Sequence, residues 1–144
     1  MYSRSVTQPP PTAELVTYAA RLVRVVSRAA ANESPAALRL LSQLDELGEI
    51  SVTELARADR TTQPTTSAGV RALEDKGWVT RVAHPDDARS TLLALTGSGR
   101  AELAAARLRH GSVVDDLAAK QSIDPAAIAE AVAVLRALTT AERS

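Results

Sequence analysis

The sequence of 144 residues predicts a mostly α-helical fold with one small β-hairpin. Apolar side chains recur at helical spacing along most of the chain. Two short runs, WVTRVA (78–83) and STLLALT (90–96), are instead rich in β-branched and apolar residues, and the HPDD segment between them has the composition of a turn. The length allows one domain with a core, so we expect the hairpin and the helices to form one intertwined domain.

The composition narrows the possible chemistry. The chain has no cysteine, which excludes thiolate catalysis, disulfides and Cys-ligated zinc, and its two histidines, His84 and His110, are too few for a histidine-rich metal site. We therefore expect no cofactor and no metal. An aromatic content of 2% argues against a stacking platform for single-stranded nucleic acid. The net charge of zero leaves only local basic clusters to attract DNA.

No apolar run is long enough to cross a membrane, and residues 1–14 lack the apolar segment of a signal peptide. We therefore expect a cytoplasmic protein with no membrane partner. Residues 1–11 are proline-rich and predict a flexible leader.

Two helices are predicted in the first third of the chain. The first covers residues 12–31, with Thr12 as its N-cap. In the second, Ser34 provides the cap, Pro35 occupies the first helical position, and the apolar stripe ends near Gly48.

Two shorter helices are predicted before the hairpin. Ser51 and Glu54 have the spacing of a capping box at the start of one, and Thr62 caps the other, which ends at Gly77. After the hairpin, residues 100–121 predict a long helix, and Asp124 with Pro125 begins a last one.

Two short helices joined by a tight turn and followed by a hairpin form a winged helix-turn-helix, whose second helix can enter the major groove of DNA. Short polar side chains in its first turn can bind phosphates or base edges. Such a first turn is also the ordinary composition of a helix start. The candidate residues of the recognition helix are Thr62, Gln63, Thr65, Ser67, Ala68 and Arg71.

Asp87 and Arg89 lie two residues apart beside the turn of the hairpin. In an extended strand their side chains would share a face, so the carboxylate could orient the guanidinium toward a narrow minor groove. The same spacing also fits an ordinary surface ion pair.

Residues 51–99 resemble the DNA-binding core of the MarR family of bacterial transcriptional regulators. The resemblance rests on ELA at 54–56, on LEDKGWV at 73–79, on DAR at 87–89 and on LTGSG at 95–99. It implies a homodimer in which helical regions 12–32 and 100–144 interlock, while residues 33–99 form the winged helix-turn-helix.

The resemblance also assigns roles. Arg89 would enter the minor groove with Asp87 orienting it, and the dimer would bind double-stranded DNA at a pseudo-palindromic operator. Three positions depart from the family pattern: His84 replaces an acidic residue, while Gln63 and Ala88 replace arginines. These departures leave fewer cations to face the DNA. Contacts to the DNA backbone would then depend on Arg57, Arg60, Arg71 and Arg81.

Several alternatives remain open. Catalysis is disfavoured because adjacent Asp86 and Asp87 would point to opposite faces of a strand, and no nucleophile with a partner histidine is present. A winged helix can also serve as a protein-interaction scaffold without specific DNA binding. His110 is either a packed histidine at a helix interface or a sensor of pH or ligand. From the resemblance we expect a repressor released by a small aromatic or lipophilic effector.

Overall fold

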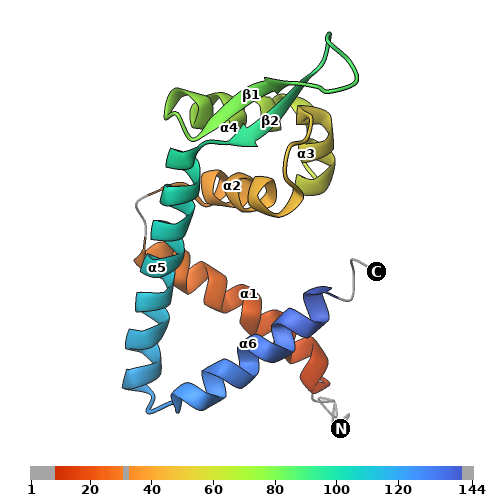
Figure 1. Ribbon diagram of the computed structural model, residues 1–144. Coiled ribbons are helices and arrows are strands. Elements are labelled where there is room, and N and C mark those ends of the chain that lie inside the picture. Colours follow the sequence, from red (N-terminus) through yellow and green to blue (C-terminus); the bar gives the residue numbers. More distant parts are fainter. Residues whose placement is uncertain (1–8, 31–32, 141–144) are drawn as a thin grey trace, which may run out of the picture.

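The computed structural model describes residues 9–30 and 33–140 and places six helices and one two-stranded antiparallel sheet within them (Figure 1). In chain order these are α1 (Pro11–Ala29), α2 (Pro35–Leu47), α3 (Val52–Asp59), α4 (Gln63–Asp75), β1 (Val79–Ala83), β2 (Thr91–Leu95), α5 (Gly97–Lys120) and α6 (Pro125–Thr140). The predicted fold class is confirmed.

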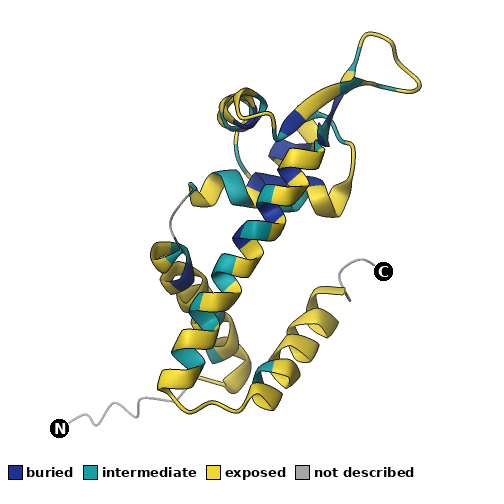
Figure 2. Ribbon diagram, turned by 60° about the vertical axis from the view of Figure 1, so that its left-hand side comes forward, coloured by how far each residue is buried: buried dark blue, intermediate teal, exposed yellow. Residues whose placement is uncertain are grey.

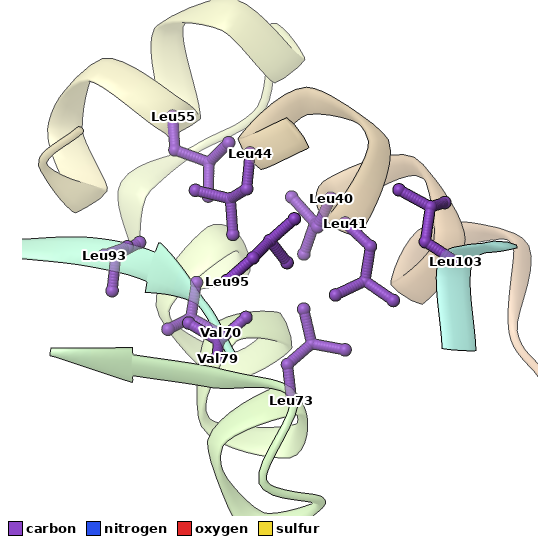
Figure 3. Packing of buried hydrophobic residues seen from close by; sticks show 10 residues of the cluster. All are labelled: Leu40, Leu41, Leu44, Leu55, Val70, Leu73, Val79, Leu93, Leu95 and Leu103. Carbon is purple, nitrogen blue, oxygen red and sulfur yellow. The ribbon is translucent and has the colours of Figure 1, made fainter. Parts of the chain in front are cut away.

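The core lies where α2, α3 and α4 pack against the hairpin and the first turns of α5 (Figure 3). We call residues 33–95, from the approach to α2 through β2, the winged lobe. Its helices and strands supply nearly every member of one cluster of buried aliphatic side chains, to which α5 adds Leu103. The cluster consists of Leu40, Leu41, Leu44, Leu55, Val70, Leu73, Val79, Leu93, Leu95 and Leu103. This core fixes the lobe as one body, from which α4 and the hairpin project.

Helix starts in the winged lobe follow the capping signals of the sequence. The Ser34 hydroxyl accepts a hydrogen bond from the Ala37 amide. Ser51 and Glu54 form the predicted capping box, in which each side chain accepts from the backbone amide of the other. These bonds satisfy amides that a helix start leaves without an intrahelical partner.

The start of α1 corrects a prediction. The helix begins at Pro11, with Pro10 in the N-cap position and no side-chain capping bond, so Thr12 lies inside the helix rather than capping it. The fixed φ of proline suits the first helical position, which is why the helix starts earlier than expected. Residues 1–8 of the predicted leader lie outside the described residues.

The hairpin contacts the segment before α3 and the start of α5. Its register pairs Val79 with Leu95, and Ile50 extends the sheet by a single antiparallel bridge to Leu93, which the sequence analysis did not identify. At its base, a Cβ on Gly99 would lie 2.1 Å from the carbonyl oxygen of Trp78. Only glycine therefore allows α5 to start this close to β1.

The remaining helices form what we call the helical end: α1, the C-terminal half of α5, and α6. The 24-residue helix α5 leaves the winged lobe and packs on α1, where Val26 is buried. Helix α6 buries none of its residues, and although it crosses α1 in the view of Figure 1, the turned view of Figure 2 shows it standing apart. Among the described residues, no helix is long and apolar enough to cross a membrane.

Candidate nucleic-acid interface

The first turn of α4 carries hydroxyl groups that bond to one another. The Thr62 hydroxyl accepts from the Thr65 amide at 3.4 Å, and the two hydroxyl oxygens lie 2.8 Å apart. Thr62 is thus the predicted N-cap, and both side chains remain exposed. The free amides of this first turn point outward and favour an anion such as a phosphate.

The outer face of α4 is an open groove of about 440 Å³. Four of the six predicted recognition residues line it together with Pro64: Gln63, Ser67, Ala68 and Arg71. An amide, a hydroxyl and a guanidinium on one exposed helix face can donate to phosphates and to base edges. Thr62 and Thr65 belong to the same helix start but do not line the groove.

Thr66 is a residue of this helix that the sequence analysis missed. It is 2% exposed, and its hydroxyl lies 2.7 Å from that of Thr61 in the turn before α4. The run of polar residues at 61–67 hides this difference, since only the helical spacing to buried Val70 and Leu73 marks Thr66 as inward-facing.

The turn of the hairpin corrects the expected geometry of Asp87 and Arg89. The segment is a turn and not an extended strand. The Asp87 carboxylate accepts from the Ser90 hydroxyl at 2.7 Å and from the Arg89 backbone amide at 3.0 Å. These two bonds hold the pKa of Asp87 below its usual value. Within the described residues, no ion pair joins this carboxylate to the Arg89 guanidinium.

Asp87 therefore shapes the backbone that carries Arg89 rather than holding its side chain. Arg89 is exposed in the loop that projects beyond the sheet (Figure 1). The nearby His84 accepts a hydrogen bond from the Asp86 amide at Nδ1, at 3.1 Å, which adds a second side-chain bond to this turn. Where the family pattern has an acidic residue, the imidazole supplies the acceptor.

The expected backbone-contacting arginines differ in their surroundings. Arg57 and Arg60 are exposed at the end of α3, next to the turn that leads into α4. Arg81 pairs with Glu74 at 2.8 Å, which joins β1 to α4 and engages its guanidinium within the lobe. His110 is half-buried in α5, far along the chain from these groups. Among the described residues, no group of three or more His, Asp or Glu side chains could hold a metal ion.

The site therefore combines a polar groove on α4, exposed arginines beside it and a projecting hairpin with an exposed arginine. The MarR family model matches residues 34–91, the segment that contains α2, α3, α4 and most of the hairpin. Over this segment the chain resembles the MarR family. No curated protein matches its sequence closely enough to add a function.

Solved structures share the fold over nearly the whole chain. A protein of Pseudomonas aeruginosa PA01, described as a candidate transcriptional regulator, is 26% identical, with a TM-score of 0.72 and coverage of 92% of this chain and 93% of that one. Wild-type MarR of E. coli in its apo form is 19% identical, with a TM-score of 0.74 over 91% and 97% of the two chains. A MarR family protein of Bacillus stearothermophilus is 22% identical, with a TM-score of 0.70 over 100% and 99%.

These likenesses fix the class of the protein. It has the winged helix fold of MarR-family transcriptional regulators, and its candidate interface residues lie on α4 and the hairpin of that fold.

Proposed function

We propose that the protein is a homodimeric, sequence-specific repressor that binds a pseudo-palindromic operator in the cytoplasm. Each α4 lies in a major groove with Gln63, Ser67 and Arg71 toward the DNA, and each hairpin brings Arg89 to an adjacent minor groove. Thr62, Thr65 and Ala68 complete the α4 surface, and Arg57 and Arg60 contact the backbone. The observation that carries the proposal is the exposed polar groove of α4 beside the projecting hairpin.

The apolar surface of the helical end supports a dimer. In α1, Val16 is 70% exposed and Val23 is 64% exposed, and in α6 Leu138 is 59% exposed. Apolar patches of this extent on a monomer mark a contact surface. A second copy, related by twofold symmetry, would cover both helices and place two α4 helices on one side of the assembly.

A cavity of about 430 Å³ at the junction of α1 and α2 supports release by an effector. Its walls are mostly apolar with guanidinium groups at hand, and its lining residues are Val23, Arg24, Ser27, Arg28, Glu33 and Pro35. A small aromatic or lipophilic effector bound between the helical end and the winged lobe would shift the spacing of the two α4 helices away from the 34–36 Å that successive major grooves require.

The proposed function is tested by selection from a random duplex library with the whole chain at about 0.15 M salt, followed by sequencing. We expect an inverted repeat whose half-sites lie about 10 base pairs apart, centre to centre. Absence of any enriched sequence, with binding that vanishes at modest salt, would contradict the proposal and favour the protein-interaction scaffold. Release is then tested by screening small aromatic and lipophilic compounds for loss of operator binding.

A further inference from the structure

A buried carboxylate at the end of α3, directly before the turn into α4, is paired with α2. Asp59 is the last residue of α3, and its side chain is only 3% exposed. Arg39 of α2 donates to it through Nε at 2.5 Å and through Nη2 at 3.1 Å, a two-pronged ion pair between residues 20 positions apart. A planar guanidinium in this geometry fixes orientation as well as distance.

Thr61 and Gln43 lie near the same carboxylate. Arg39 above all, with smaller contributions from Thr61 and Gln43, holds the pKa of Asp59 below its usual value. The side-chain oxygen of Gln43 is buried without a hydrogen-bond partner.

The chain of contacts ends on the recognition helix. The Thr61 hydroxyl lies 2.7 Å from the buried Thr66 hydroxyl of α4. One turn later, a Cβ on Gly69 would lie 2.7 Å from Leu40 of α2, so α4 sits closely on α2 at this point. Thr66 thus gives the inward face of α4 a polar contact with the turn that follows Asp59.

The turn itself needs outside support. Arg60 adopts a left-handed conformation, with φ of 52°, which is unfavourable for a residue with a side chain. The Thr61 amide bonds back to the Ala56 carbonyl at 3.1 Å. Such backbone conformations persist where surrounding contacts determine them, and Asp59 stands directly before this residue.

We propose that Asp59 is a positioning residue for DNA reading: its ion pair with Arg39, directly before the turn into α4, sets the placement of α4 on the winged lobe without touching DNA. The inference rests on the proposed function, since it concerns how the same α4 groove is presented. It assigns the network a role in discriminating the operator from other DNA, beyond its role in folding.

The test compares D59N with a matched control, D45N. Asp45 forms another Asp–Arg pair between helices, with Arg107 of α5 at 2.9 Å, away from the turn. Both variants and the wild type are titrated with the selected operator and with random-sequence duplex, at a temperature where circular dichroism shows all three folded. For D59N we expect about a tenfold loss of operator affinity, with random-sequence affinity changed less than about twofold and an unchanged salt slope.

The control D45N should keep the wild-type ratio of operator to random-sequence affinity. If D59N fails to fold, R39K replaces it, since lysine keeps the charge but loses the fork, and about a threefold loss of the ratio is expected. The inference would be overturned if folded D59N, or R39K in its place, kept the wild-type ratio of operator to random-sequence affinity.

A second readout separates this inference from the proposed function. Amide hydrogen exchange of the free protein should be faster in D59N at Thr61 and Thr66, whose amides bond to Ala56 and Thr62, and unchanged in α5. If the wild type selects no operator, the proposed function fails on its own. Unchanged exchange at both amides in D59N would refute the positioning role whatever the DNA result.

Discussion

The winged lobe and the helical end bury their apolar side chains to opposite extents. In the winged lobe, Leu41, Leu55 and Leu73 are at most 1% exposed. At the helical end, α6 buries none of its residues (Figure 2). Val16 and Val23 of α1 are also exposed. The lobe therefore has its core within one chain, whereas the helical end leaves an apolar surface exposed, as contact surfaces do.

The difference separates two tasks. The part proposed to touch DNA must hold α4 and the hairpin in a fixed relation, and a closed core does this. The part proposed to join two copies must keep its apolar surface available for the partner. Folding of the lobe and association of the helical end should therefore respond to different substitutions.

The largest effect is expected from a cavity in the lobe. Leu41→Ala should lower the free energy of unfolding by about 2 to 5 kcal/mol, because Leu41 is fully buried and its neighbours cannot fill the space. Urea unfolding measures the loss. The matched control Leu108→Ala, at a side chain 76% exposed, should change it by less than about 0.5 kcal/mol. Equal losses in the two variants would contradict the claim that the winged lobe holds the closed core.

A charge in α6 should affect association and leave the lobe intact. Leu135→Glu is expected to weaken the dimer by about 2 to 4 kcal/mol, since it would place an unpaired carboxylate in an apolar contact. Sedimentation measures the association, and the fluorescence of Trp78 reports on the lobe. The control Thr53→Glu adds a charge to an exposed position of α3. It should leave the mass of the assembly in sedimentation unchanged. A Leu135→Glu protein with unaltered association would remove α6 from the interface.

The hairpin should contribute to DNA binding without contributing to folding. Arg89→Ala is expected to cost about 1 to 2 kcal/mol of operator affinity and to make the salt slope shallower by about one contact. Unfolding in urea should not change, because Arg89 is exposed and makes no ion pair within the described residues. The control is Arg107→Ala, which removes an arginine of α5. Operator affinity equal to that of the wild type would exclude the hairpin from the interface.

The smallest effect concerns the capping box. Ser51→Ala should destabilise the lobe by about 1 kcal/mol at pH 7. The Ser51 amide and hydroxyl hold the pKa of Glu54 below its usual value, so the pKa should rise toward that value in the variant. A lowered folded pKa stabilises the fold above the unfolded pKa, and this contribution is lost as the pH falls through the folded pKa. The two proteins should therefore differ less at pH 3 than at pH 7, as urea unfolding can show.

Local signals predicted much of this structure from sequence. Ser51 with Glu54, Pro35 and the two β-rich runs each act within a few residues, and each gave the correct element. Contacts between distant residues were not predictable in this way. Arg39 and Asp59 are far apart in sequence, and Ile50 joins the sheet only because β2 lies beside it.

In the turn of the hairpin, sequence also failed to predict a geometry between residues that are close in the chain. The spacing of Asp87 and Arg89 predicts a shared face only if the backbone is extended, and here it turns. Thr12 likewise has the chemistry of a cap, but the preceding prolines set the start of α1. Four of the six predicted recognition residues line the groove on α4, and the roles of all six in binding remain predictions.

The central claim is that two winged lobes, joined through their helical ends, read one operator together. It is tested most directly by inserting five base pairs between the half-sites of the selected operator, which rotates one half-site by about half a helical turn. We expect the whole chain to bind this duplex no better than a single half-site, because its two α4 helices then face opposite sides of the DNA. Affinity equal to that for the original spacing would contradict the account, since it would mean that each lobe binds independently.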